Sequence, residues 1–290
     1  MEKGLKQQIK ELIWRLPFTA ELDLSLRGYY GLKDNHINKL DKELNKWVRE
    51  AKASQTMSKP EEKQHIFLFA ATHAWIPNTM IMALAFRAMG HKFSYGYVPY
   101  MKWFDDVNDY NRRKLDHLVW KTIKKADGLV DLIPFTSVPG EEIPEELIKE
   151  TNDHSVRDCQ YTFMAEEIDL SDELYDLRLR RNTAVTASLL HWLKNNEPDI
   201  VIVPNGMVFE YGAVMNVARY LDIPVTTYEY GEQAGKMWLD QGRSVMLQDS
   251  SGFWDSVKAL EFKDEQKVLS LIHISEPTRP PVASRMPSSD

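Results

Sequence analysis

The sequence DIVIVPNGMVFEYGAVMNVARYLDIPVTTYEYGEQ at residues 199–233 decides the fold class. Short runs at residues 200–203 and 225–228 are expected to be strands that are buried in a sheet, and the first of them is uninterruptedly apolar. Apolar residues between these runs, around residues 208–221, recur at helical spacing. A strand, a helix and a second strand in this order predict a right-handed crossover between parallel strands.

The same alternation of strands and helices runs through most of the chain. Further strands are expected at residues 65–71, 93–98 and 129–133, with a short one at 160–164. Helices are expected at residues 37–53, 79–89, 107–126, 145–150 and 172–195. The sequence therefore predicts an α/β fold with a Rossmann-like, mostly parallel sheet that is flanked by helices.

Three regions are expected along the chain. Residues 1–60 look helical and polar, and we expect them to form an N-terminal extension that lies across the main sheet. Residues 61–263 are expected to form the Rossmann-like domain. Residues 264–290 begin a helix that has no continuation and end in a segment rich in proline and serine.

The last residues of the chain differ in character from the rest. The string IHISEPTRP at residues 272–280 resembles the translation of a sequencing adapter, which appears at the ends of assembled metagenomic reading frames. We therefore expect residues 271–290 to be foreign and disordered, and the natural protein to continue beyond this fragment. A genuine tail rich in proline and serine is the alternative.

Composition and charge narrow the class of protein. The 290 residues carry a formal net charge of -7, which argues against nucleic acid as the main partner. A single cysteine, Cys159, excludes an internal disulfide and fits a cytoplasmic location. Charged residues interrupt every apolar run before the ~18 residues that a membrane span needs. Residues 5–16 could form an amphipathic helix, which either packs on the protein or makes peripheral contact with a membrane.

Several common motifs are absent from the sequence. It has no GxGxxG after a strand, no GxxxxGK(S/T) and no GxSxG. A dinucleotide fingerprint, a P-loop and the nucleophile elbow of a hydrolase are therefore not indicated. The metal-binding patterns HExxH and paired CxxC are also missing. We expect no bound cofactor or metal.

The first candidate residues lie in ATHAWIPN, at residues 71–78, directly after the first buried strand. His73 could act as a general base toward a hydroxyl, because the unperturbed pKa of histidine lies near neutrality. It could equally orient a sugar hydroxyl or serve a structural purpose, and Thr72 precedes it. Trp75 could stack on a sugar ring or fill the core, and Asn78 could cap the helix that follows.

A second group of candidates lies in PNGMVFE, at residues 204–210. Asn205 and Gly206 favour a sharp turn in which φ is positive. Glu210 falls in the first turn of the next helix, where the helix dipole favours a carboxylate, so a structural role and ligand contact are both open. The backbone amides at this helix start could also bind an anion.

The third group lies in EYGEQAGKMW, at residues 229–238, after another buried strand. Glu229 and Glu232 flank Tyr230 and Gly231, and carboxylates in a cleft suit the recognition of hydroxyl groups. Surface salt bridges are the alternative for these carboxylates. Because parallel strands end along one edge of a sheet, we expect this group, His73 and Asn205 to converge there.

Three segments of the sequence resemble the N-terminal domain of a GT-B glycosyltransferase, closest to bacterial group-1 and surface-polysaccharide types. The segments are FLFAATHAWIPNTMIMALAFRAMGHKF, PDIVIVPNGMVFEYGAVMNVARYLDIPVTTYEYGEQ and MWLDQGRSVMLQDSSGFW. The resemblance implies two Rossmann-like domains that face one cleft. The N-terminal domain holds the acceptor and often the base, and the C-terminal domain holds most of the nucleotide-sugar site. This chain would lack that second domain.

The resemblance implies a function for the complete enzyme and roles for the candidate residues. It would transfer a sugar from a nucleotide-sugar donor, its co-substrate, to a hydroxyl of a carbohydrate or lipid-linked acceptor in polysaccharide biosynthesis. His73 would be the base or an orienting group. The acceptor would contact residues from all three segments, namely Thr72, Asn78, Asn205, Gly206, Glu210, Glu229, Tyr230, Gly231 and Glu232.

Two alternatives to a glycosyltransferase stay open. A nucleotide-sugar 2-epimerase could have the same two-domain shape and use carboxylates for proton transfer at the sugar. A Rossmann-like module without catalytic activity could bind a carbohydrate or a partner protein.

Overall fold

The computed structural model describes residues 8, 12–27, 36–55, 62–100, 102–104, 106–231, 235–260 and 264. The chain divides into two compact units, residues 1–247 and residues 248–290. The first unit holds the sheet. In the second unit, a short helix, α9 (Ser251–Val257), is described.

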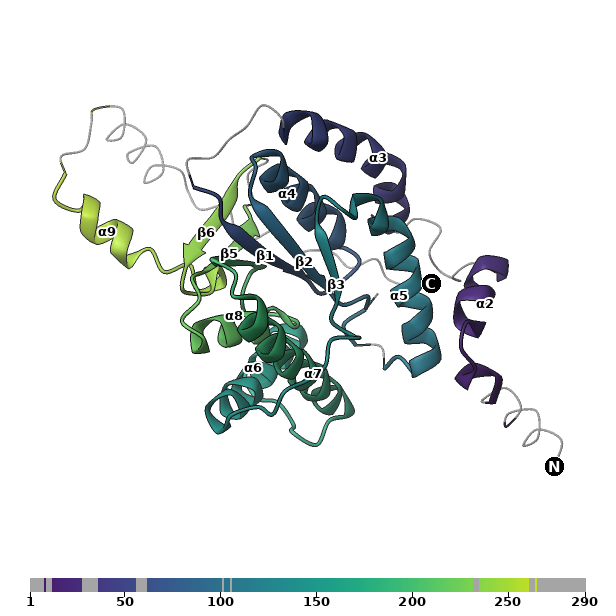
Figure 1. Ribbon diagram of the computed structural model, residues 1–290. Coiled ribbons are helices and arrows are strands. Elements are labelled where there is room, and N and C mark those ends of the chain that lie inside the picture. The colour runs from purple at the N-terminus through teal and green to yellow at the C-terminus, as the bar shows by residue number, and fades with distance from the viewer. Residues whose placement is uncertain are drawn as a thin grey trace, which may run out of the picture. The chain divides into compact units, whose positions relative to one another are not determined.

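The described residues of the first unit form a six-stranded sheet with the order β3-β2-β1-β4-β5-β6 (Figure 1). Its strands are β1 (His65–Ala70), β2 (Lys92–Tyr97), β3 (Asp131–Pro134), β4 (Ile200–Pro204), β5 (Val225–Tyr230) and β6 (Met237–Gln241). The first five strands are parallel, and β6 pairs with β5 in the antiparallel direction. This is the strand order of the Rossmann fold, so the predicted fold class is confirmed.

Helices cover both faces of this sheet (Figure 1). On one face, α3 (His36–Gln55), α4 (Ile76–Ala88) and α5 (Asp109–Ile123) pack on a core that includes Ile66 and Leu68. On the other face, α6 (Glu145–Phe163), α7 (Glu173–Asn196) and α8 (Tyr211–Tyr220) pack on a core that includes Phe67 and Phe69. Alternate residues of β1 thus enter opposite cores, as the pleat of a strand requires. A shorter helix, α2 (Thr19–Arg27), packs on α5.

Most of the predicted elements are present with small shifts at their ends. The one-sided helix predicted at residues 37–53 is α3, whose Ile37, Leu40 and Leu44 belong to the first core. The helix predicted at residues 107–126 is α5, followed by a 3-10 turn (Lys124–Ala126). Among the described residues, no helix combines the length and the apolar character that crossing a bilayer requires. Apart from Asp264, the final region at residues 264–290 lies outside the described residues.

The prediction was wrong for α6. A short helix at residues 145–150 and a strand at residues 160–164 were expected, but one helix of 19 residues spans both segments. The inward face of α6 carries polar residues, namely Thr151, His154, Ser155 and Asp158. A pattern that relies on apolar residues therefore does not detect this buried helix face.

Two boundaries near the candidate residues also differ from the prediction. Helix α4 begins at Ile76, with Trp75 at the N-cap position and Pro77 in the first turn, so Asn78 does not cap it. Glu229 and Tyr230 belong to β5 instead of a loop, because the antiparallel strand β6 extends the pairing to them. The sequence did not reveal β6, since this edge strand is largely exposed and has no buried apolar face.

Candidate functional site

The three predicted segments follow strands that are neighbours in the sheet. Strands β1, β4 and β5 are adjacent and parallel, so the residues that follow them lie along the same carboxyl edge. The chain runs from β1 toward β3 on one side and from β4 toward β6 on the other. The edge between β1 and β4 is therefore the topological switch point, where open α/β sheets bind their ligands.

Backbone hydrogen bonds hold the segment after β1 in place. Thr72 is buried, and its carbonyl accepts hydrogen bonds from the amides of Trp75 (3.1 Å) and Ile76 (3.2 Å). The amide of His73 donates to the carbonyl of Tyr100 at 3.2 Å, which ties this segment to the one after β2. The side chain of His73 is half-buried, and Asn78 is exposed in the first turn of α4.

The aromatic ring of Trp75 connects the segment after β1 with β5. It stacks on Tyr230 with ring centroids 5.7 Å apart and an interplanar angle of 20°. It also meets Tyr211 and Tyr228 edge to face. Trp75 is half-buried and Tyr230 is 43% exposed, so the stacked pair borders on solvent at the carboxyl edge.

The segment after β4 is a tight turn held by Asn205. This residue has a φ of 39°, and its Oδ1 accepts hydrogen bonds from the amides of Met207 (3.0 Å) and Val208 (2.9 Å). The next amide, of Phe209, donates to Oδ1 of Asp158 at 2.9 Å. These three amides already have protein acceptors, so the predicted anion site has no donors left among them.

Gly206 is required by this turn. Its φ is +75°, a conformation that disfavours any side chain. A Cβ atom there would lie 2.6 Å from Cγ2 of Thr227 and 2.8 Å from Sδ of Met215. The turn therefore brings the backbone close to β5 and α8.

Glu229 lies beside this turn, at the end of β5. The Asn205 side chain donates a hydrogen bond to its carboxylate, and its Oε1 also accepts from the amide of Tyr230 at 3.0 Å. Burial raises the pKa of Glu229, and these hydrogen bonds oppose the shift. Gly231 follows and donates to the carbonyl of Lys236 at 3.0 Å, whereas Glu232 lies outside the described residues.

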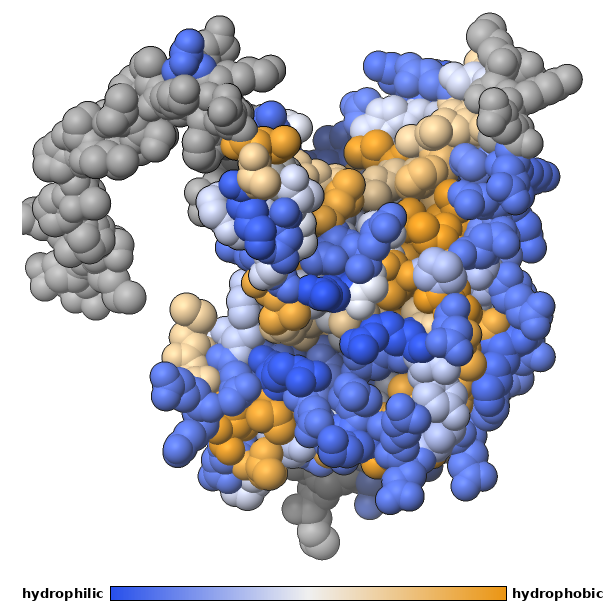
Figure 2. Space-filling view, turned by 90° about the vertical axis from the view of Figure 1, so that its left-hand side faces the viewer, coloured by the Kyte–Doolittle hydropathy of each residue, from blue (hydrophilic) through white to orange (hydrophobic). Residues whose placement is uncertain are grey.

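Hydrophobic side chains are exposed where β5 and β6 meet. Trp238 on β6 is paired with Glu229 on β5 and is 57% exposed, and Met237 and Leu239 are exposed as well. Figure 2 shows the side of the molecule on which these strands lie in Figure 1, where hydrophobic patches interrupt a mostly hydrophilic surface. The carboxyl edge thus combines a carboxylate with exposed aromatic rings.

Glu210 lies in a different environment from Glu229. Its side chain is 1% exposed, and its Oε1 is 3.0 Å from Nη1 of Arg178. The same guanidinium, which is fully buried, holds Oδ2 of Asp158 through Nε at 2.7 Å. Burial works to lower the pKa of Arg178, yet Glu210 and Asp158 together raise it above its ordinary value. Glu210 is therefore held by protein groups, at a position without exposed surface for a ligand.

Arg181 completes what we name the buried charge cluster, which consists of Asp158, Arg178, Arg181 and Glu210. Two carboxylates and two guanidinium groups balance in charge. The guanidinium of Arg181 lies 3.7 Å from the ring centroid of Tyr100 and donates to the carbonyl of Trp103 at 3.0 Å. The cluster therefore joins α6, α7 and the segments after β2 and β4.

The sequence did not reveal Asp158, Arg178 or Arg181 as site-forming residues. A signal was present, because Arg178 and Arg181 lie on the inward face of a helix whose Leu177 and Val185 are buried. Charged residues within an inward apolar face indicate buried ion pairs. Their partners come from other elements, so the pairing itself needed the structure.

Comparisons with known proteins find similarity among solved structures alone. No protein-family model matches the sequence, and no curated protein matches it. Among solved structures, the crystal structure of CalG4, the calicheamicin glycosyltransferase, is similar, with 19% identity and a TM-score of 0.31. The match covers 73% of this chain and 41% of that chain, so this chain spans less than half of the solved protein. Similarity at this level carries no conclusion about activity, and the Rossmann-like class rests on the strand order itself.

Proposed function

We propose that this chain is the acceptor-side domain of a GT-B glycosyltransferase. The full protein would move a sugar from a nucleotide-sugar donor to a hydroxyl of a carbohydrate or lipid-linked acceptor. The observation that carries the proposal is that Glu229, held by Asn205, and the stacked rings of Trp75 and Tyr230 lie along the same carboxyl edge, next to the switch point. The sequence resemblance to GT-B enzymes supports the same proposal.

An aromatic ring next to a carboxylate suits a sugar in two ways. The C–H groups on a sugar ring pack on an aromatic face, and Tyr230 and Trp238 offer exposed rings. The carboxylate of Glu229 accepts hydrogen bonds from hydroxyl groups. Asn205 positions that carboxylate, since its own Oδ1 is committed to the turn.

His73 is the proposed base. Its backbone is tied to Tyr100, and its ring is carried by the segment that also places Trp75. The imidazole would take the proton of the acceptor hydroxyl while the hydroxyl oxygen bonds to the anomeric carbon. The bond from that carbon to the nucleotide diphosphate would break at the same centre, and no resident cofactor or metal is proposed.

The remaining candidates take supporting roles in this proposal. Thr72, Asn205 and Gly206 shape the backbone, and Glu210 acts through Arg178 on the segments around the site. Asn78, Gly231 and Glu232 stay predicted acceptor contacts.

The test is sugar transfer by the full-length protein that contains this chain. We expect transfer from a nucleotide sugar to an acceptor, and a loss of kcat of about 100-fold to 10,000-fold in His73→Ala, the usual contribution of a general base. The variant His117→Ala on α5 is the matched control, because this histidine is half-buried like His73 and lies outside the site.

Three other results would each overturn part of the proposal. An unchanged rate in His73→Ala would remove the base. Isomerised nucleotide sugar in the absence of an acceptor would favour a 2-epimerase. Sugar binding without any turnover would favour a module that only binds carbohydrate.

A further inference from the structure

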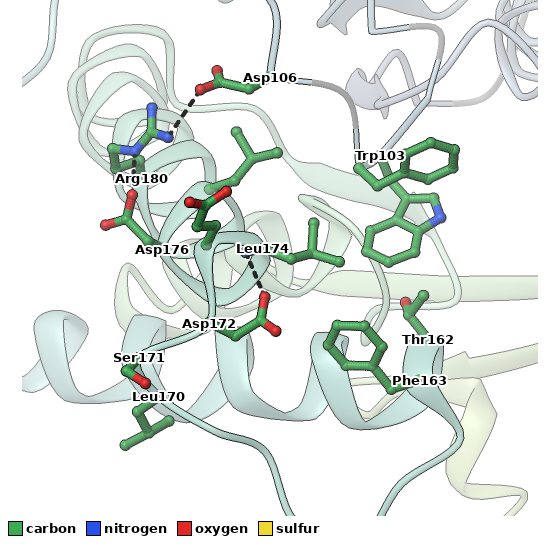
Figure 3. Close-up of a pocket in the computed structure, with 13 residues that line it drawn as sticks. Trp103, Asp106, Thr162, Phe163, Leu170, Ser171, Asp172, Leu174, Asp176 and Arg180 are labelled. Carbon is green, nitrogen blue, oxygen red and sulfur yellow. Dashed lines mark hydrogen bonds and ion pairs between the residues drawn. The ribbon is translucent and has the colours of Figure 1, made fainter.

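A cleft of about 1140 Å³ lies between the segment after β2, the end of α6 and the start of α7 (Figure 3). Figure 3 shows Trp103 and Phe163 on one side of this cleft and Asp106, Asp176 and Arg180 on the other, with Asp172 between them. None of these residues belongs to the site proposed above. The cleft therefore combines an aromatic wall with an acidic wall.

The acidic wall has an excess of negative charge. Asp106, Asp172, Glu173 and Asp176 line the cleft together with Arg180, which gives four carboxylates, one guanidinium and a net charge of -3. Arg180 is already held by Asp176 (2.9 Å) and Asp106 (3.4 Å). The cleft therefore disfavours phosphates and other anions and favours a cation.

The aromatic wall is exposed to the cleft. Phe163 is 42% exposed at the end of α6, and Phe104 packs edge to face on Trp103 with ring centroids 5.5 Å apart. Nζ of Lys102 lies over the ring of Phe104 at 5.3 Å, so that ring already has a cation over one face. Phe163 and Trp103 are the rings that remain for a ligand, through apolar contact or cation–π attraction.

Stabilisation of the start of α7 explains only some of the side chains that line the cleft. Asp172 caps α7 through a hydrogen bond of 2.7 Å from the amide of Leu174, and Glu173 and Asp176 lie in the first turn, where carboxylates are favourable. Asp106 comes from the segment after β2, and Phe163 comes from α6. The dipole of α7 therefore does not explain why Asp106 and Phe163 line the cleft.

We propose that this cleft binds a ligand that carries a protonated amine next to an apolar ring or chain. The amine lies between the carboxylates of Asp172 and Glu173, and the apolar part lies against Phe163 and Trp103. This inference stands on the cleft alone and does not depend on the proposed sugar transfer.

The experiment compares two small probes of the same shape. 2-Phenylethylamine is protonated at pH 7, and 2-phenylethanol is its neutral counterpart. We titrate each into the 290-residue chain and follow chemical shifts by NMR. The amine should bind about tenfold more tightly than the alcohol at low salt, from cation–π attraction and partly exposed ion pairs together. This preference should shrink as salt screens the carboxylates.

Two variants locate the site. Asp172→Asn keeps a residue that caps helices well and removes one charge, so we expect amine affinity to fall about threefold while the helix stays intact. Phe163→Ala should weaken both probes, whereas the matched control Tyr161→Ala, an exposed ring on the same helix outside the cleft, should weaken neither. Circular dichroism verifies that each variant is folded.

Three outcomes would overturn the proposal. These are equal affinity for the amine and the alcohol, no binding of either probe at millimolar concentration, and equal effects of Phe163→Ala and Tyr161→Ala. Each would leave the proposed glycosyltransferase function unaffected, because no variant touches His73 or Glu229.

Discussion

Glu210 follows β4 and Glu229 lies at the end of β5 in the same sheet, yet the two carboxylates lie in opposite environments. Glu210 belongs to the buried charge cluster, where Arg178 holds it and solvent does not reach it. Glu229 lies at the carboxyl edge, half-buried, beside Asn205 and exposed aromatic rings. The comparison teaches that a carboxylate near the end of a strand can serve as a ligand group only when packing between distant elements leaves it partly exposed and does not pair it with a cation.

The largest effect is expected from breaking the buried charge cluster. Arg178→Met leaves Asp158 and Glu210 buried with Arg181 alone, which should lower the free energy of unfolding by about 3–5 kcal/mol. Arg180→Met is the matched control on the same helix. Its ion pairs are exposed, so the loss should stay below about 1 kcal/mol. Urea denaturation measures both, and similar losses would show that the cluster is not a structural centre.

A smaller effect is expected at the turn that separates Glu210 from the carboxyl edge. Gly206→Ala places a Cβ atom against Thr227 and Met215 and strains a positive φ, for a cost of about 2–4 kcal/mol. Gly128→Ala is the control, because its φ of +77° is nearly the same and no atom lies within 4 Å of its Cβ position. It should cost only about 1 kcal/mol. Equal losses of unfolding free energy would mean that the close approach at Gly206 is unimportant.

The smallest effect concerns the ionisation of Glu229. Its pKa in the folded protein is raised by burial above the ordinary 4.5, so the folded state holds this proton more tightly than the unfolded state. Ionised Glu229 therefore costs stability, and the cost grows as pH rises from about 4.5 through the folded-state pKa.

The variant Glu229→Gln has no ionisable group at this position, so it removes this contribution to the pH dependence of stability. Relative to wild type, the variant should gain stability between pH 4 and pH 7, by less than about 1 kcal/mol because solvent screens a half-exposed group. Thermal unfolding across this pH range measures the difference, with the exposed Glu43→Gln on α3 as control. A difference that is constant with pH, or that changes in the opposite direction, would contradict the raised pKa.

Much of the sheet could be predicted from the sequence, because β1 and β4 are nearly continuous apolar runs, which are typical of strands buried on both faces of a sheet. Helix α6 and strand β6 could not, since one buries a polar face and the other is an exposed edge. The candidate segments after β1, β4 and β5 were predicted to meet, and adjacent strands bring them to one edge.

The surroundings of each candidate residue were harder to predict. Arg178 is 20 residues from Asp158 and 32 residues from Glu210 along the chain, and nothing local links these side chains. Asn205 was expected to contact an acceptor, but its Oδ1 is used to build the turn. Only packing between elements decides which polar groups are satisfied by the protein and which remain for a ligand.

The most direct test of the central claim is the binding of carbohydrates to this chain at the carboxyl edge. Isothermal titration with a panel of oligosaccharides should find a ligand whose affinity falls about tenfold or more in Tyr230→Ala and several-fold in Glu229→Gln, through the loss of stacking and of a hydrogen bond to a charged group. Tyr161→Ala and Glu43→Gln should bind like wild type. Unchanged affinity in both site variants would contradict the account.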